Sequence, residues 1–475
     1  MKTQLLLLAC LLGVACSVYG ASESTRWHAG KEQVAQEAEE KDNEQQGKEQ
    51  APTLSVSGYG TFHSGFSSPN ITYYNGENQS KWIKDSQKST AKDSKDTSMP
   101  RMNAGLAGIN LVANGRTKND WIYGVTFEID AMKGATGVDK MYLTFDQNNF
   151  GSIEVGNVKG PEAKMLCGGQ QLAGGTCGPD GTMGCDIAMP VGVISPIYVV
   201  GYSNKATKIS YYSPVIGGFQ AGLAITPDTK LVGPSPKDRR VGDCSFGNDC
   251  GLFCKGDNDK QSPSGRNNIV VALSHTHAFA NGFGTKFSVA YLMEDTKAVN
   301  TNCYVNDGAK AEFANRSIPL RNARSWFATS TLSFGDFKIA FGALFNGKSR
   351  LPKASAYKDN QTHILPGGFI ASKHSNAGRC YNFGLQYILN DWTFATVYHN
   401  TNRKITKKQK TRSDIVSFYV DRVVCPGFKM FLEIDGVNAK SCDRACSLYN
   451  LSRAEKNAIM KQKTILIAIG AKVSF

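Results

Sequence analysis

Apolar and polar side chains alternate with a period of two along most of the chain after residue 53. This alternation predicts β-strands, because successive side chains of a strand point to opposite faces of its sheet. The last twelve residues show the pattern clearly: Ile465, Ile467 and Ile469 share one face, and the chain ends on Phe475, on that same face. Turn-forming Gly, Asn, Asp and Pro residues separate sixteen such segments. They cover residues 54–66, 104–113, 121–130, 140–146, 151–158, 206–212, 218–225, 268–276, 283–292, 325–333, 336–346, 379–389, 391–399, 413–421, 427–435 and 464–475.

The connections between these segments alternate between short and long. The short set is 114–120, 147–150, 213–217, 277–282, 334–335, 390 and 422–426, and the long set is 67–103, 131–139, 159–205, 226–267, 293–324, 347–378, 400–412 and 436–463. A transmembrane barrel has an even number of antiparallel strands, short periplasmic turns and long external loops, whereas a soluble sandwich does not sort its loops by length in this way. We therefore predict an all-β fold, a transmembrane antiparallel β-barrel of about sixteen strands. The stretch VGVISPIYVVG at 191–201 could add a hairpin and raise the number to eighteen.

The start of the chain predicts export. Residues 1–20 combine Lys2 with an apolar stretch from Leu5 to Ala15, a pattern typical of a secretory signal peptide. Residues 21–52 hold eight acids against four bases and predict an acidic, low-complexity periplasmic leader. No later apolar run approaches the ~18 residues that a membrane helix needs. An exported chain without such a helix can span a bilayer only as a closed barrel, so we assign residues 53–475 to a barrel in the outer membrane of a Gram-negative bacterium.

Composition agrees with a barrel whose inner face is polar. The chain has 41% hydrophobic residues and a mean hydropathy of −0.30, values that hydropathy alone would assign to a soluble protein. Removing the net −4 of residues 21–52 and the single charge of Lys2 from the total of +14 leaves +17 on the rest of the chain. This surplus favours anionic solutes or partners. Nucleic acid is excluded as a partner, because the chain is exported and carries no nucleic-acid-binding motif.

Eleven cysteines follow residue 20, and in an exported chain we expect them to form disulfides. The odd number leaves at least one thiol free or paired with another chain. Zinc is the competing interpretation, because Cys250 and Cys254, and Cys442 and Cys446, have ligand-like spacing, but no histidine lies among them and we expect no metal. Cys425 belongs to a predicted periplasmic turn. The other ten are candidates for disulfides that staple external loops: Cys167, Cys177, Cys185, Cys244, Cys250, Cys254, Cys303, Cys380, Cys442 and Cys446.

Two blocks of sequence carry a family resemblance. The stretch ISYYSPVIGGFQAGLAI at 209–225 has a tyrosine, Ser213-Pro214, a short spacer and Gly218-Phe219 between two strands. MYLTFDQNNFGSIEVGN at 141–157 combines an aromatic-alternating strand, an acidic turn, Phe-Gly and a second strand, and VSGYGTF at 56–62 and the terminal phenylalanine complete the pattern. These blocks resemble the Gram-negative general diffusion porins. The mass, the cysteine content and the acidic leader are also similar to those of the surface-antigen porins of neorickettsial intracellular bacteria.

The resemblance implies a water-filled channel for passive diffusion of small hydrophilic solutes, a homotrimer and no cofactor. It also implies insertion into outer-membrane lipid by the barrel-assembly machinery, with Phe475 as the barrel-closing residue. In the family the third external loop folds into the barrel and narrows the pore. The corresponding segment here is 159–205, although Cys167, Cys177 and Cys185 are unlike the family's loop. Its charged candidates for the constriction are Lys159, Glu162, Lys164, Asp180 and Asp186.

Inward parity along the strands identifies further charged residues for the wall of the lumen. Opposed acids and bases across such a pore would create a transverse field that selects solutes by size and charge. The bases are Lys140, Lys208, Lys286 and Lys338, and the acids are Glu128, Asp130 and Glu154.

Two other functions compete with the channel. The first is a surface barrel that acts mainly as an adhesin or antigen through its long loops, for which the sequence names no host partner. The second is an outer-membrane hydrolase, with His275 and His277 as a tempting pair. These histidines continue the apolar face of Ile269, Val271 and Leu273, so we expect them to pack at the membrane boundary. No catalytic set or cofactor motif is recognisable, and we predict no enzymatic activity.

Overall fold

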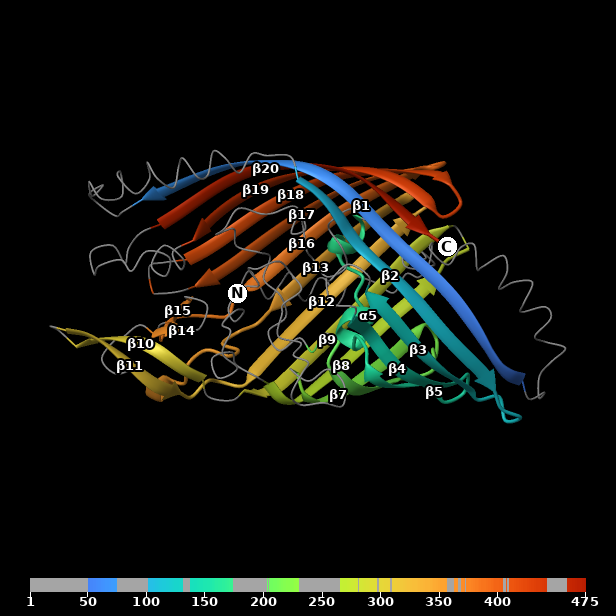
Figure 1. Ribbon diagram of the computed structural model, residues 1–475, viewed down its shortest axis with the longest axis horizontal. Coiled ribbons are helices and arrows are strands. Elements are labelled where there is room, and N and C mark those ends of the chain that lie inside the picture. Colours follow the sequence, from blue (N-terminus) through green and yellow to red (C-terminus); the bar gives the residue numbers. More distant parts are fainter. Residues whose placement is uncertain are drawn as a thin grey trace.

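The chain folds into a closed barrel of sixteen antiparallel strands (Figure 1). The computed structural model describes residues 50–74, 101–130, 137–173, 203, 205–229, 265–280, 282–296, 299–307, 310–356, 363–365, 369–371, 373–404, 407, 410–441 and 459–475. Around the ring the strands are β1 (Gln50–Tyr74), β2 (Arg101–Arg116), β3 (Ile122–Asp130), β4 (Gly137–Gln147), β5 (Gly151–Asn157), β6 (Thr207–Tyr212), β7 (Phe219–Asp228), β8 (Gly265–Ala278), β9 (Phe283–Thr296), β12 (Ala323–Phe334), β13 (Phe337–Phe345), β16 (Arg379–Leu389), β17 (Trp392–Lys404), β18 (Lys410–Cys425), β19 (Phe428–Ser441) and β20 (Ile459–Ser474).

The predicted barrel is confirmed, with sixteen strands in the ring rather than eighteen. Each predicted segment corresponds to one barrel strand, and the short connections lie at one end, which we call the turn end. Several strands reach further towards the opposite, loop end than predicted, such as β1 and β20. Polar residues continue the backbone ladder there, where the apolar alternation has already stopped. The possible hairpin at 191–201 lies outside the described residues.

The first and last strands close the ring. β1 and β20 pair in continuous register from Tyr59 opposite Ser474 to Tyr74 opposite Ile459. Beyond them, Phe475 and Gly58 exchange two backbone hydrogen bonds, of 3.0 and 2.9 Å. Closure pairs the backbone groups that two open edges would otherwise expose.

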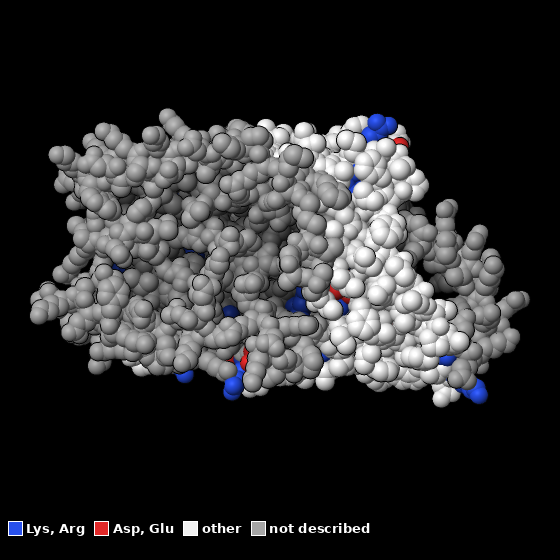
Figure 2. Space-filling view, in the orientation of Figure 1, with Lys and Arg blue, Asp and Glu red and all other residues white. Residues whose placement is uncertain are grey.

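Side chains sort by parity onto the two faces of the wall. Large apolar residues such as Val271, Phe341 and Ile469 are exposed on the outside, as a lipid-facing surface requires. The inward positions of the same strands hold small and polar residues, for example Ala272 and Ser274. In Figure 2 the described part of the outer wall is largely without charge, and lysines and arginines gather near its ends. Among the described residues, no helix is long and apolar enough to cross a membrane.

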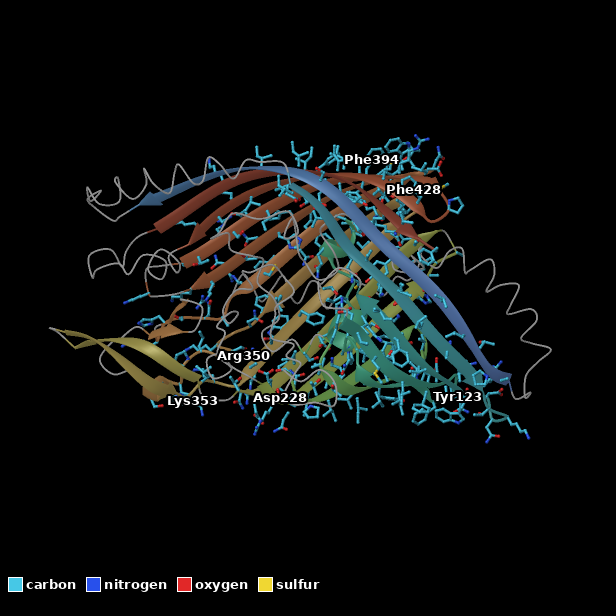
Figure 3. All side chains as sticks on the ribbon, viewed as in Figure 1. Tyr123, Asp228, Arg350, Lys353, Phe394 and Phe428 are labelled. Carbon is cyan, nitrogen blue, oxygen red and sulfur yellow. The ribbon has the colours of Figure 1, made fainter. Side chains whose placement is uncertain are left out.

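Aromatic residues surround the turn end. The ring centroid of His275 lies 4.2 Å from that of Phe219 and 6.0 Å from that of His277. The centroids of His277 and Phe279 are 5.8 Å apart. Figure 3 shows Tyr123, Phe394 and Phe428 at the same end of the barrel. The two histidines thus pack at the boundary, as expected. Within the described residues, no group of His, Cys, Asp or Glu could hold a metal ion.

At the loop end, the connection between β9 and β12 is hydrogen-bonded to the connection between β13 and β16, a contact that we call the clasp. Arg321 donates a backbone hydrogen bond of 2.8 Å to Leu351, and Lys353 donates one of 2.9 Å to Pro319. Below them the Arg350 guanidinium pairs with the buried Glu294 carboxylate at 2.5 Å. Two hairpins outside the ring accompany this clasp, β10 (Val299–Asp307) with β11 (Lys310–Ile318) and β14 (His363–Leu365) with β15 (Phe369–Ala371). The sequence analysis did not predict these hairpins, because β10 and β11 are largely polar and the three-residue strands β14 and β15 are too short to show a period.

Candidate functional site

The lumen holds a segment of the connection between β5 and β6. Residues 158–173, here called the inward segment, form α5 (Pro161–Lys164) and η2 (Gly169–Gln171). α5 lies against β7, β8 and β9, and η2 lies against β13, β16 and β17, so the segment runs along the inner wall (Figure 1). Proline in the first turn suits the start of α5, because its missing N–H would have no partner there.

Inward-facing side chains of the wall hold the backbone of this segment. Asn382 on β16 accepts the Gly169 N–H at 2.7 Å, and Thr329 on β12 accepts the Cys167 N–H at 3.2 Å. Further along, the Gln386 amide donates to the Leu172 carbonyl at 2.8 Å. These contacts satisfy main-chain groups that secondary structure leaves unpaired.

Glycines allow the segment to approach the wall closely. A Cβ atom at Gly384 would lie 2.8 Å from the carbonyl oxygen of Gly169. A Cβ atom at Gly222 would lie 2.7 Å from the sulfur of Met165 and 2.8 Å from Cβ of Pro161. α5 and η2 therefore each rest on a glycine of the wall, one on β7 and one on β16.

Charges around the inward segment are paired locally. The Lys164 ammonium contacts both oxygens of Glu154, at 2.5 and 2.6 Å. Burial lowers the pKa of Lys164 below its ordinary value, and the nearby Glu154 carboxylate opposes this shift. On the neighbouring strands Lys140 pairs with Glu128, which also accepts a 2.8 Å hydrogen bond from the Tyr59 hydroxyl. Among the described residues, two of the expected lumen acids thus pair with neighbouring lysines, and the transverse field across the pore stays a prediction.

The remaining candidates occupy distinct surroundings. Glu162 is buried and accepts a 2.8 Å hydrogen bond from Ser203, while Lys208 is buried and donates to the Val158 carbonyl. Lys159, Lys286 and Lys338 are half-buried. Asp130 ends β3, and its side chain is not described. Asp180 and Asp186 lie outside the described residues.

The cysteines only partly follow the sequence analysis. Cys167 and Cys380 are free, buried thiols, contrary to the expected disulfides, and Cys425 is free and exposed. Cys167 belongs to the inward segment and packs against Thr329 of the barrel wall. Cys303 lies on β10, and its side chain is not described. The other candidates, Cys177, Cys185, Cys244, Cys250, Cys254, Cys442 and Cys446, lie outside the described residues.

We expect the three free thiols to react at very different rates. Burial raises the pKa of Cys167 to about 11, so at pH 8 only about one thiol in a thousand is ionised and able to react. A soluble maleimide should therefore label Cys425 within minutes in the native protein and Cys167 and Cys380 only after unfolding. Mass spectrometry of labelled peptides measures this order. Rapid native labelling of Cys167 would show that the inward segment does not bury it.

Sequence reasoning missed the residues that hold the inward segment. Gly222, Thr329, Asn382, Gly384 and Gln386 all have inward parity, but parity does not reveal which inward residues meet the segment. A weak signal existed at Gly384 and Gly222, since glycine inside a strand often marks a close approach of another backbone.

Fold and lumen together define a channel-forming outer-membrane barrel. A family model described as Gram-negative porin matches residues 34–438. The chain therefore belongs to the Gram-negative porin family and is an outer-membrane diffusion channel.

Several solved structures are similar to this chain at low sequence identity. The anion-selective porin from Comamonas acidovorans is 11% identical, with a TM-score of 0.50 and coverage of 90% of this chain and 100% of that one. The outer membrane channel DcaP of Acinetobacter baumannii is 13% identical, with a TM-score of 0.47 and coverage of 90% and 98%. OmpT, an outer membrane protein of Vibrio cholerae in a trimer form, is 10% identical, with a TM-score of 0.47 and coverage of 90% and 100%. A comparison with curated proteins gives no match.

Proposed function

We propose that the protein is a homotrimeric porin in which the inward segment narrows the lumen and small hydrophilic anions pass more readily than cations. The observation that carries the proposal is the packing of residues 158–173 on the inner wall of a closed ring. A closed barrel gives solutes a path through the bilayer, and a segment on its inner wall reduces the cross-section of that path. The homotrimer is the assembly that the family resemblance implies, and the mass of the detergent-extracted protein tests it.

The preference for anions follows from the balance of charge near the inward segment. Lys140, Lys159, Lys164, Lys205 and Lys208 lie there, together with the half-buried Lys286 and Lys338 of the wall. Fewer acids accompany them: Glu128, Asp139, Glu154 and Glu162, with Asp130 at the end of β3. On the far wall, buried Asp421, Glu433 and Asp435 act in the opposite direction. Because the two sets partly offset each other, the selectivity should be modest.

Reversal potentials in planar bilayers test this proposal. With a tenfold KCl gradient we expect open conductance steps and a reversal potential displaced towards the chloride equilibrium value. A reversal potential displaced towards the potassium value would contradict the selectivity and show that the acids of β18 and β19 dominate. A lack of conductance steps from folded protein would contradict the open channel itself.

A further inference from the structure

We propose an oxyanion-binding subsite on the inner wall of the barrel, formed by His399 and Thr401 of β17 and by Thr411 and Ser413 of β18. The proposal rests on the anion-preferring channel above and names where, and through which groups, anions are held on their way through it. It takes carboxylates and phosphates, which share the chemistry of two or three exposed, negatively charged oxygens.

The four side chains form one continuous strip. Thr401 lies directly opposite Ser413 in the β17–β18 pair, and all four residues have inward parity. Opposed side chains of such a pair are about 5 Å apart and successive side chains on one face about 7 Å, so neighbouring hydroxyls can reach one small anion. The strip starts beside the inward segment, because His399 is the register partner of Asn382, and it continues towards the external end.

Among the residues that the structure describes, none of these side chains has a hydrogen-bond partner. They are 0 to 3% exposed, yet Nδ1 and Nε2 of His399 and the hydroxyl oxygens of Thr401, Thr411 and Ser413 make no hydrogen bond. Buried polar groups in folded proteins are nearly always paired, and leaving one unpaired costs about 1–3 kcal/mol. Five such atoms on two adjacent strands therefore indicate a surface that takes its partners from the contents of the lumen.

The charges nearby select an anion. The run from Arg403 to Arg412, which joins β17 to β18 at the external end, holds six bases and no acid. Arg403 itself has inward parity and lies opposite Thr411. The nearest inward acid in register is Asp435, which lies opposite Ser417, about 13 Å further along β18 from Ser413. On the inward face of the described strands no carboxylate adjoins these hydroxyl and imidazole N–H donors, and donors in such surroundings favour an oxyanion over a cation.

Apolar residues frame the strip and define its edges. Val397 and Ile415 follow it towards the turn end, and Ala439 lies beside Ser413 on β19. Beyond Ile415, the next inward polar side chain on β18 is Ser417, whose hydroxyl already donates to the Asp435 carboxylate. The geometry places the strip before the inward segment for a solute that enters from outside.

Block of the chloride current tests the subsite in the full-length channel. Inorganic phosphate, added to KCl on both sides of a planar bilayer, should reduce the current with a saturable half-blocking concentration, and acetate should do the same if carboxylates are taken as well. In the double variant Thr401→Val with Ser413→Ala, we expect the half-blocking concentration to rise about a hundredfold, since two hydrogen bonds to a charged ligand are lost and each contributes about tenfold in affinity. Thr393→Val is the matched control: its hydroxyl is also inward and buried on β17 but lies far from the strip, so block should be unchanged.

Several results would overturn the subsite. An unchanged half-blocking concentration in the double variant, or no saturable block by either anion, would leave the strip as a merely hydrated wall. Equal block by glucose would assign it to neutral hydroxyl compounds. Equal KCl conductance of variant and wild type shows that the variant is folded. If the double variant does not assemble, Ser413→Ala alone should raise the half-blocking concentration about tenfold. Failure of the porin proposal itself would be visible earlier, as missing or cation-selective steps in KCl alone.

Discussion

Deletion of Phe475 should reduce the folded barrel in the outer membrane at least tenfold, while export of the chain continues. Phe475 donates to and accepts from Gly58 across the seam between the first and last strands. Loss of the residue leaves the N–H and C=O of Gly58 without partners at the closing rung. Each backbone hydrogen bond contributes about 1 kcal/mol net, and an unpaired group costs several times more where lipid replaces water. Heat-modifiable migration on gels, together with surface labelling, measures the folded fraction.

A substitution at the same position separates the two contributions of the residue. Phe475→Ala keeps the backbone pair with Gly58 and removes only the ring, whereas Phe475→Tyr keeps both. If pairing is what matters, Phe475→Ala should assemble much better than the deletion. If it behaves like the deletion, the aromatic ring is what the assembly machinery requires. Normal surface levels of the deletion protein would contradict the role of Phe475 altogether.

Replacement of Gly384 by valine should release the inward segment and enlarge the channel. A Cβ atom there would meet the carbonyl oxygen of Gly169 at 2.8 Å and its Cα at 3.0 Å, and backbone cannot yield as a flexible side chain can. Overpacking of this kind costs about 1–3 kcal/mol, and a displaced η2 also loses the hydrogen bond from Gly169 to Asn382. We expect a larger single-channel conductance and faster entry of larger sugars in liposome swelling.

The matched control uses another strand glycine. Gly436→Val adds the same side chain on β19, where the nearest atom to its Cβ is the Val416 carbonyl oxygen at 3.9 Å. This variant should keep the wild-type conductance. If Gly384→Val conducts like wild type while remaining folded, the inward segment does not limit the pore.

The strands could be predicted from the sequence because lipid and water impose opposite polarity on the two faces of a barrel wall. The terminal strand shows this well: Ile465, Ile467 and Ile469 face outward, and the inward Leu466 and Ala468 between them are buried. Only strands that face lipid show this alternation of apolar and polar side chains. The hairpin of β10 and β11 lies outside the barrel ring, and its largely polar sequence has no such alternation.

The lumen was less predictable. The inward segment was expected from family resemblance, but its ion pair between Lys164 and Glu154 joins a loop residue to a strand residue, and no spacing rule connects them. The alternation of side chains correctly placed Glu154 on the inner wall. It did not indicate that Lys164, in the connection that follows β5, would pair with it. Cys167 was assigned to a disulfide from its exported context, and its burial against Thr329 depends on where the loop folds. Such contacts depend on how the connection folds into the lumen, and the spacing of residues along the sequence does not reveal this.

The clasp between the connections that follow β9 and β13 has a consequence for how the protein can diverge. Three contacts hold these two connections together where they leave the barrel: Arg321 with Leu351, Lys353 with Pro319, and Arg350 with Glu294. The residues of each connection beyond the clasp form a loop whose two ends are already held. Each doubling of the length of such a loop raises the free energy of loop closure by only about 0.6 kcal/mol. The parts above the clasp can therefore accept insertions, deletions and altered epitopes with little effect on the barrel below. Under immune or phage pressure, we expect sequence change to collect in 299–318 and 357–372 and to spare Glu294 and Arg350.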